Sequence, residues 1–207
     1  MKVLVIADEQ VKRFYEHYEE GIFKPYDLIL SCGDLAPEYL SFIATMCHAT
    51  VLYVHGNHDE VYKERPPEGC LSVEDKIYNF KGLRILGLGG SMRYRDTNFP
   101  PTQHTEFEMK RRIRKLSWKL RRNKGFDILL AHAPAAGLND AEDPAHRGFQ
   151  CFKKLMDKYE PAYFIHGHVH GNYGKGYKRL DHYGKTTVIN GWQSYEFEIP
   201  DPVPESK

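Results

Sequence analysis

Apolar and polar residues alternate along the chain with two different periods. Short apolar runs rich in β-branched residues predict buried strands, because they are shorter than a helix and are bounded by turn residues. These runs cover residues 1–7, 26–31, 50–54, 127–131 and 163–165. Between them, apolar residues at helical spacing predict helices. The predicted helices cover residues 9–20, 37–47, 104–124 and 149–159.

Further strands are predicted without helices between them. Residues 77–80 and 83–88 predict a hairpin-like pair, and late strands are expected at 177–182, 186–190 and 194–199. Helices and strands alternate early and strands dominate late, which favours an α/β layered fold with two sheets over one wound sheet. We expect one domain over residues 1–199 and a polar tail over residues 200–207.

The bulk composition narrows the class of protein. The chain has 207 residues, 41% hydrophobic and 28% charged, with a net charge of +1, so charge alone indicates neither a nucleic acid nor a membrane partner. The first apolar run is too short for a signal peptide, and no run approaches the ~20 residues that span a bilayer. Four dispersed cysteines without a C-x-x-C pair predict buried free thiols. We therefore expect a cytoplasmic protein.

Five predicted strands end in side chains that can bind a metal ion. These are Asp8, Asp34, the Asn57-His58-Asp59 triplet, His132, and the pair His168 and His170. A single aspartate at a strand end usually caps a turn, but independent turns have no common reason to carry carboxylate, amide and imidazole groups. In open α/β sheets, sites form outside the carboxyl ends of the strands. The residues therefore predict one shared crevice, and the eleven histidines of the chain point to a metal.

The order of these motifs resembles that of the calcineurin-like metallophosphoesterase superfamily. The resemblance rests on Gly33-Asp34, Gly56-Asn57-His58-Asp59 and Gly167-His168-Val169-His170, and its motifs span residues 8–170. It implies a four-layer αββα sandwich of two mixed sheets with two metal ions at the strand ends. It also implies that a small stand-alone enzyme hydrolyses a phosphomonoester or phosphodiester, from a small molecule or nucleotide, by in-line attack of a hydroxide that bridges the metals.

The resemblance implies a role for each residue of the motifs. Asp34 would bridge both metals, His58 would act as general acid or phosphate stabiliser, and Asp59 would orient the ring of His58. The other ligands of the first and second metal would be Asp8 and His170, and Asn57, His132 and His168, respectively. Two divalent ions outweigh the two ligand carboxylates, so the site would attract a phosphate. The mixed ligands suit Mn, Fe, Ni, Co or Zn without choosing among them.

The chain departs from the family pattern at its first motif. The usual D-x-H reads Asp8-Glu9-Gln10 here, so a neutral amide replaces an imidazole ligand. Three alternatives follow. Gln10 or Glu9 binds a weaker or different first metal, or substrate phosphate completes the first site, or the fold is a catalytically idle interaction scaffold. The intact His58 and Asp59 argue against the scaffold.

Loop residues near the motifs are candidates for substrate binding, because arginine suits bidentate phosphate contact. The candidates are Arg93 with its neighbours Tyr94 and Arg95, His146 and Arg147 in the polar loop 135–148, and Asn172 and Tyr173. Ordinary surface charge is an equal alternative for each.

A separate basic segment lies in the predicted helix 104–124. Nine of the fifteen residues from Lys110 to Lys124 are Lys or Arg. The ordinary interpretation is a solvated helix face, and the alternative is a contact with the backbone of a nucleic acid. A phosphodiesterase that processes nucleic acid with this helix therefore stays open as an alternative function.

Overall fold

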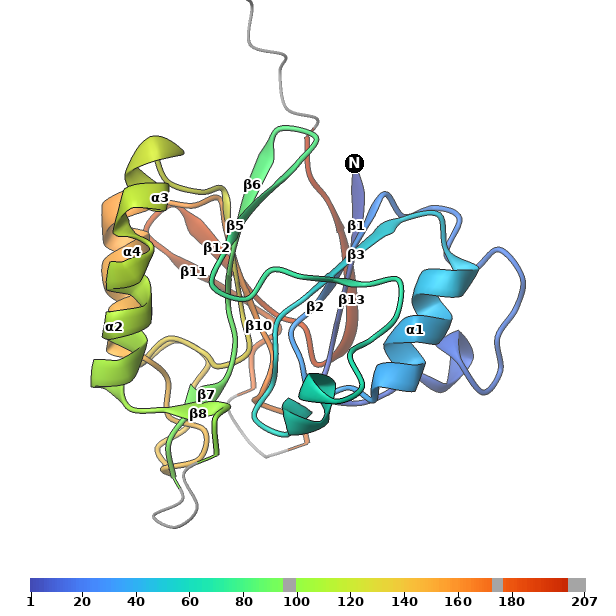
Figure 1. Cartoon of the computed structure of the whole chain (residues 1–207), viewed down its shortest axis with the longest axis horizontal. Coiled ribbons are helices and arrows are strands. Elements are labelled where there is room, and N and C mark those ends of the chain that lie inside the picture. The colour runs from blue at the N-terminus through green and yellow to red at the C-terminus, as the bar shows by residue number, and fades with distance from the viewer. Residues whose placement is uncertain (95–99, 173–176, 201–207) are drawn as a thin grey trace, which may run out of the picture.

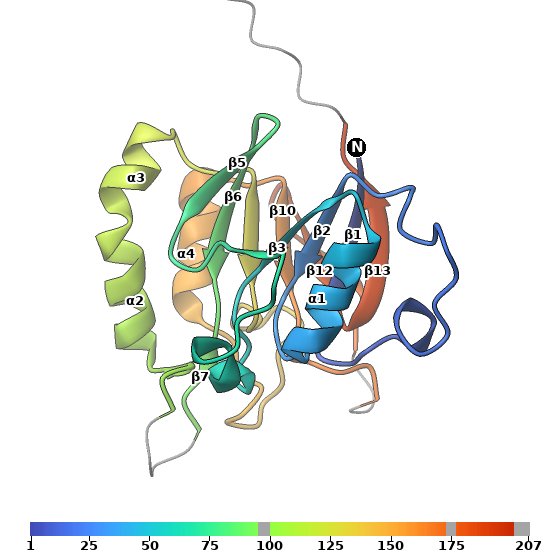
Figure 2. The same ribbon diagram turned by 45° about the vertical axis from the view of Figure 1, so that its right-hand side comes forward.

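Two β-sheets pack face to face between two layers of helices in the computed structural model, which describes residues 1–94, 100–172 and 177–200 (Figure 1). Helix α1 (Pro37–Met46) covers the outer face of one sheet. Helices α2 (Glu106–Lys115), α3 (Ser117–Arg122) and α4 (Gln150–Tyr159) cover the other. Figure 2 shows the same layers from a second direction. The predicted four-layer αββα sandwich of two mixed sheets is confirmed.

The first sheet has the order β13-β1-β2-β3-β4. Its strands are β1 (Lys2–Ala7), β2 (Leu28–Ser31), β3 (Thr50–Tyr53), β4 (Leu71–Ser72) and β13 (Gln193–Glu198). Strands β1 to β4 run parallel, and β13 pairs with β1 in the antiparallel sense. Because β1, β2 and β3 are parallel, their carboxyl ends meet at one edge.

The second sheet has the order β11-β12-β10-β9-β6-β5. Its strands are β5 (Ile77–Phe80), β6 (Leu83–Leu88), β9 (Ile128–Ala131), β10 (Tyr163–His166), β11 (Leu180–Tyr183) and β12 (Thr186–Asn190). The four central strands are parallel and both edge strands are antiparallel. The predicted pair at 77–88 is therefore an antiparallel hairpin. A separate two-stranded sheet joins β7 (Ser91–Met92) to β8 (Gln103–His104).

The alternation of side chains along each strand divides the core into three layers. In β1, Val3 and Val5 pack between the two sheets, whereas Leu4 and Ile6 pack against the layer of α1. In β10, Ile165 faces the space between the sheets and Phe164 faces α4. Both faces of these strands are buried, which explains why they read as continuous apolar runs in the sequence.

Two predicted helices differ from the structure. Residues 9–20 contain only a short 3-10 helix, η1 (Lys12–Phe14), because aromatic packing fixes the segment: the Phe14 ring lies 5.3 Å from that of Phe23. The predicted helix 104–124 is divided at the buried Leu116, which is both the C-cap of α2 and the N-cap of α3. Periodicity also missed β4, β7, β8 and the 3-10 helix η2 (Asp59–Lys63).

The cysteines agree with the sequence-based expectation of free thiols. All four are free, and Cys32 and Cys151 are buried while Cys47 and Cys70 are partly exposed. Within the residues that the structure describes, no helix is both long and apolar enough to cross a membrane. The predicted polar tail falls almost entirely on residues 201–207, which lie outside the described part of the chain.

Candidate metal centre

The strand ends of both sheets meet at one edge of the sandwich. Oxygen donors come from the first sheet: Asp8 follows β1, Asp34 follows β2, and Asn57 follows β3. Imidazole donors come from the second sheet: His132 follows β9, and His168 and His170 follow β10. The ligand atoms of Asp34, His132 and His168 lie within 4.8 Å of one another. The structure thus joins donors that are up to 134 residues apart in the sequence (168 − 34 = 134).

The backbone at these strand ends adopts conformations that L-residues rarely take. Asp8, Asp34 and His168 have φ values of 66°, 56° and 69°, in the left-handed region. Such strain persists only where the surrounding structure enforces it, and it is concentrated at functional sites. Gly33 and Gly56 allow the loops after β2 and β3 to touch, because a Cβ on Gly56 would overlap the carboxylate of Asp34. The glycines of the two motifs therefore serve the close approach of two loops.

His132 is the centre of the cluster. Its Nδ1–H donates to the carbonyl of Cys32 at 2.8 Å, and this bond fixes the tautomer and turns Nε2 toward the other donors. Nε2 lies 2.9 Å from Asn57 Oδ1 and 3.3 Å from Asp34 Oδ2. Similarly, His168 Nε2–H donates to the carbonyl of Ala145 at 2.7 Å. Each ring thus uses one nitrogen for a backbone carbonyl and keeps the other for a ligand.

The charges of the cluster depend strongly on one another. Burial alone would lower the pKa of His132, but attraction to Asp34 and Asp8 outweighs burial and raises it to about 9. Burial would raise the pKa of Asp34, but the same attraction and the bond from His58 N–H lower it to about 2. The pKa of His168 falls to about 3 because of burial and the charge on His132. Without a metal, the pair is therefore imidazolium and carboxylate, and His168 is neutral.

These residues fit a metal ion. Asn57 Oδ1, Asp34 Oδ2 and a neutral His132 Nε2 all carry lone pairs, and lone pairs at hydrogen-bond distance repel unless a cation lies between them. In the metal-free protein a proton on Nε2 fills this need. The Asp8 side chain is only 1% exposed, which adds a second buried carboxylate to be neutralised. The donor set of carboxylate, amide and imidazole suits a divalent transition metal.

The second group of predicted ligands is looser. His170 Nε2 lies 3.8 Å from Asp8 Oδ1, and both carboxylate oxygens of Asp8 accept from His168 N–H at 3.0 and 2.9 Å. Gln10 is exposed, and Glu9 is exposed with its carboxylate bound to the amide of Gln193. The structure therefore brings Asp8 and His170 near each other and leaves Gln10 and Glu9 at the surface.

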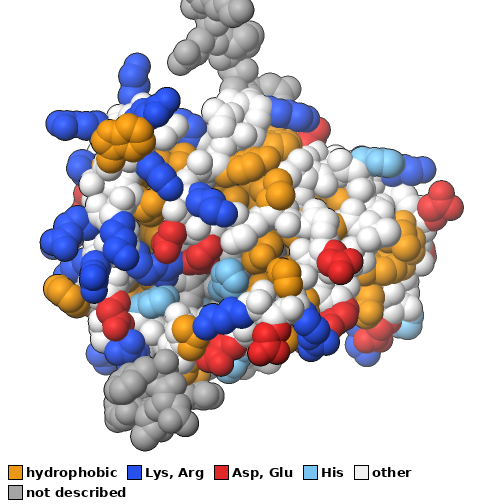
Figure 3. Space-filling model, viewed as in Figure 1, with side chains coloured by type: hydrophobic (Ala, Val, Ile, Leu, Met, Phe, Trp, Pro, Cys, Tyr) orange, Lys and Arg blue, Asp and Glu red, His pale blue; other side chains and the backbone are white. Residues whose placement is uncertain are grey.

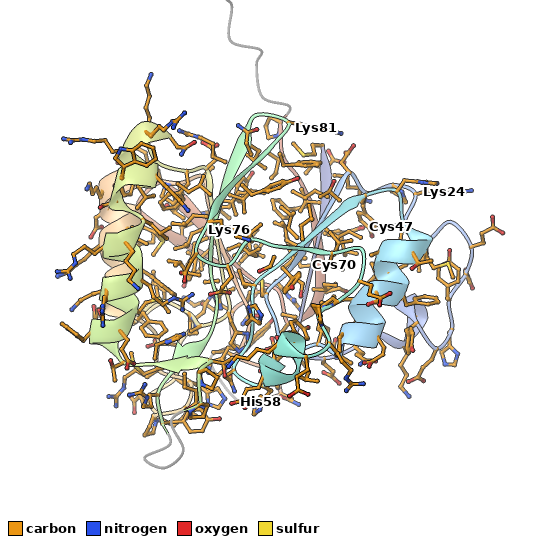
Figure 4. The ribbon with its side chains drawn as sticks, in the orientation of Figure 1. Lys24, Cys47, His58, Cys70, Lys76 and Lys81 are labelled. Atoms are coloured by element: carbon orange, nitrogen blue, oxygen red, sulfur yellow. The ribbon has the colours of Figure 1, made fainter. Side chains whose placement is uncertain are left out.

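Among the described residues, the structure shows no hydrogen bond between His58 and Asp59, and the catalytic roles of the two residues stay predictions. Asp59 is buried, and its Oδ2 accepts from the backbone N–H groups of Gly56 and Asp34 at 2.7 and 2.8 Å. Burial and the charge of Asp34 raise the pKa of Asp59 to about 6. His58 instead places its ring in solvent at the lower edge of the sheets (Figure 4), and its backbone N–H donates to Asp34 Oδ1 at 2.8 Å. Asp59 therefore orders the loops that carry the donors, because its Oδ2 accepts from backbone N–H groups of both loops.

The substrate-binding candidates divide into three groups. The ring of His146 lies 5.1 Å from that of His168, and its Nδ1 binds Asp143 at 2.9 Å, so this residue borders the cluster. Arg93 forms a salt bridge with Glu108 at the start of α2, at 2.8 Å. The remaining described candidates are Tyr94, which is partly exposed, and Arg147 and Asn172, which are exposed. Arg95 and Tyr173 lie outside the described residues.

Sequence reasoning missed several groups that position the donors. The carbonyls of Cys32 and Ala145 orient two rings, and the Trp192 ring stacks on His170 with centroids 6.2 Å apart. Gly171 gives this indole room, since a Cβ there would strike the ring. Backbone carbonyls carry no signal in a sequence. Trp192, however, follows Gly191 directly after a predicted strand, and an aromatic residue at that strand end was a detectable signal.

Buried carboxylate and imidazole donors at the strand ends of an αββα sandwich define a metal-binding α/β protein. The family model described as calcineurin-like phosphoesterase matches residues 1–172, and the chain belongs to this family. Family and cluster together support a metal-dependent phosphoesterase in general terms.

Solved structures of distant proteins share the fold. One aligns with a TM-score of 0.67 and 16% identity over 94% of this chain and 93% of its own. TT1561 of Thermus thermophilus aligns with a TM-score of 0.60 and 16% identity, over 93% of this chain and 89% of its own. GAP50, the anchor in the inner membrane complex of Plasmodium, aligns with a TM-score of 0.53 and 12% identity, over 92% of this chain and 70% of its own. No curated protein matches the sequence.

Proposed function

We propose that this protein hydrolyses phosphomonoesters or phosphodiesters with two divalent ions. Asp34 would contact both ions, and the remaining ligands would be Asp8 and His170 for one, and Asn57, His132 and His168 for the other. The gathering of Asp34, His132 and His168 within 4.8 Å is the observation that supports this most directly. Bound ions of this kind polarise a phosphate oxygen and provide a nucleophile at neutral pH.

The two groups of ligands would bind their ions unequally. The group around His132 contains two imidazoles, a carboxylate and an amide. The imidazoles and the amide are buried, and the carboxylate of Asp34 is partly buried. The group around Asp8 contains one imidazole, because the position to which the D-x-H pattern of the family would assign a second one is the exposed Gln10. Imidazole binds transition metals more strongly than an amide oxygen does. The ion beside His132 would therefore bind more tightly.

His58 would act on the leaving group. Its backbone N–H is bound to Asp34 Oδ1, so the residue is fixed beside the metal ligand while its ring stays exposed. An exposed imidazole next to a cationic site can donate a proton to the departing alkoxide oxygen, a step worth roughly 10²-fold to 10⁴-fold in rate. Asp34 and His132 would keep the cations bound during this step. Asp59 would keep the loop of His58 rigid.

The proposal is tested by turnover of p-nitrophenyl phosphate and bis-p-nitrophenyl phosphate with added Mn²⁺, Fe²⁺, Ni²⁺, Co²⁺ or Zn²⁺. The two substrates distinguish a monoesterase from a diesterase. Asp34→Asn should abolish turnover and reduce the bound metal, because it weakens both groups of ligands. Asp181→Asn, on the partly exposed edge strand β11, is the matched control and should behave as the native protein. No turnover with any of the metals, or equal behaviour of the two variants, would refute the proposal.

The role of His58 needs its own comparison. His58→Ala should lower turnover by about 10²-fold or more with unchanged metal content, since the ring is not a ligand. His48→Ala removes another exposed histidine, beyond the end of α1, and should change nothing. If His58→Ala loses metal instead, its ring binds the ion and the assignment as proton donor is wrong.

A further inference from the structure

Two adjacent hollows lie between the α2–α3 pair and α4, on the outer face of the second sheet. Their volumes are about 350 and 650 Å³, and they share Ser117, Leu120, Lys158 and Tyr159 as lining residues. They therefore form one continuous groove, which we call the α3–α4 groove. Its floor is apolar, with Ile113, Leu120 and Leu155 contributed by the three helices.

The α3–α4 groove is lined by cations, and none of the described residues that line it is an acid. Six exposed basic side chains line it, and neither hollow contains an Asp or Glu among its lining residues. The six are Lys110, Arg114, Arg121, Lys124, Lys154 and Lys158. Lys110 pairs with Glu106 at 3.3 Å, and the other five form no ion pair with any described residue. Uncompensated cations in a recess attract an anion with several charges.

The net charge of the chain conceals a strong asymmetry. Residues 110–124 carry nine cations and no acid, which leaves 29 − 9 = 20 cations against 28 acids in the rest of the chain, or −8. Figure 3 shows Lys and Arg side chains gathered over the side of the molecule that α2 and α3 form. A solvated helix face needs no such separation, because acids and bases are usually interspersed on a protein surface. The segment therefore stands out as a polyanion-binding surface.

Aromatic rings accompany these cations. Trp118 lines the groove beside Arg121 and Lys124, and this residue is 65% exposed. The guanidinium of Arg122 lies 5.4 Å from the centre of the Trp118 ring. Tyr159 lines both hollows. Tyr159 is partly buried against Phe126, so Trp118 is the exposed ring of the groove. Aromatic rings among cations are the arrangement on which bases of a single strand stack while the cations contact its phosphates.

We propose that the α3–α4 groove binds single-stranded nucleic acid. The alternating cations and rings fit a flexible chain of phosphates and bases. A flat bilayer would not reach the apolar floor, which lies in a recess between helices, and an acidic peptide would contact the cations but offers no base to stack on Trp118. This inference concerns a surface on the helical layer and goes beyond the phosphoesterase proposed above.

The test measures fluorescence anisotropy of a labelled oligouridine and oligothymidine of about 16 nucleotides, the upper end of known site sizes. A chelator is present throughout, so failure of hydrolysis and failure of binding are separate results. Six phosphate contacts predict that log affinity falls with log salt concentration at a slope of about −4, from roughly −0.7 per contact on a single strand. Affinity that does not depend on salt, or no binding to either strand, would overturn the proposal.

Two triple variants distinguish binding in the α3–α4 groove from non-specific attraction to positive charge elsewhere on the surface. Removing three groove cations, in Arg114→Ala with Lys154→Ala and Lys158→Ala, should reduce the slope by about 2. The matched control removes three exposed lysines outside the groove, Lys24, Lys76 and Lys81, which Figure 4 shows away from the three helices. The control should keep the native slope. Equal losses in the two triple variants would show that binding is diffuse and refute the groove.

Stacking is tested with Trp118→Ala, which changes an exposed side chain and should leave the fold intact. Affinity for the single strands should fall about tenfold, within the range of 1–3 kcal/mol per stacked base, with an unchanged salt slope. Binding to phosphatidylserine vesicles and binding to poly-glutamate are measured in parallel as two separate comparisons. Tighter binding to either of these than to the oligonucleotides, or no effect of Trp118→Ala, would exclude a nucleic acid strand as the occupant.

Discussion

Metal binding should depend on pH in a way that His132 determines. In the metal-free protein its pKa is about 9, so near neutral pH a proton occupies the nitrogen that a metal would need. At about pH 7 the metal displaces that proton at a cost of two pKa units, which is roughly 100-fold in affinity or about 3 kcal/mol. Log affinity for Mn²⁺ should therefore rise by about one per pH unit up to about pH 9 and then level off, as protonated ligands require.

The assay is calorimetry in buffers that differ in ionisation enthalpy, which counts the protons released with each ion. About one proton should leave per ion at neutral pH. The buried His166, whose pKa is lowered to about 4 by burial, does not titrate in this range and adds nothing. An affinity independent of pH between neutrality and about pH 9, or binding without proton release, would refute the proposed ligand role of His132.

The same shift has a consequence for stability without metal. Because the pKa of His132 in the folded chain is raised above its usual 6.5, its contribution is complete below that value and is lost as pH rises through about 9. The contribution is about 3 kcal/mol, and it belongs jointly to His132 and its partner Asp34. Urea unfolding of the metal-free protein should therefore show declining stability over this interval, and bound metal should remove the decline.

Three further predictions concern single side chains. Gly56→Ala should weaken Mn²⁺ binding at least about tenfold in calorimetry, because the new Cβ would overlap the carboxylate of Asp34. Arg112→Ala should lower the free energy of unfolding in urea by about 3 kcal/mol, since it removes the guanidinium that neutralises the largely buried Glu74. Gln10→His should raise the metal content measured after dialysis toward two ions per chain, because it restores an imidazole to the weaker group.

Two of these variants have a matched control, and the third has an outcome that would contradict it. Gly184→Ala introduces a Cβ where no atom of a described residue lies within 4 Å, so it should leave metal affinity unchanged. Arg121→Ala removes an exposed cation that forms no ion pair with any described residue, and should change stability by less than about 0.5 kcal/mol. An unchanged metal content in Gln10→His would show that position 10 does not face the ion.

The sequence predicted the sandwich and the gathering of the donors because both follow from simple rules. Apolar strands of four to six residues were visible in the pattern, and parallel strands must present their carboxyl ends at one edge. Residues 9–20 could not be predicted in this way, because the packing of Phe14 on Phe23 overrides helical periodicity. The partner of Asp59 was also beyond the sequence, since it depends on the turn that brings Gly56 N–H to the carboxylate.

Substrate-binding residues were the hardest to predict. Arg93 looked available for phosphate, yet it lies opposite Glu108, and such a pairing depends on where α2 begins relative to β7. His146 is closer to the expectation, because the loop after β9 folds back over His168. Loop charges can be read from a sequence, but their partners are determined by loop conformation.

The donors around the metal centre are divided between the two sheets, with oxygens from one and imidazoles from the other. A cation bound there would crosslink the two sheets of the sandwich at the edge where their strands end. At a concentration about 100 times its Kd, it would add about 2.7 kcal/mol against unfolding. Conversely, a substitution in the core between the sheets, such as Ile165→Ala, would weaken cation binding, because it would allow the two sheets to shift relative to each other.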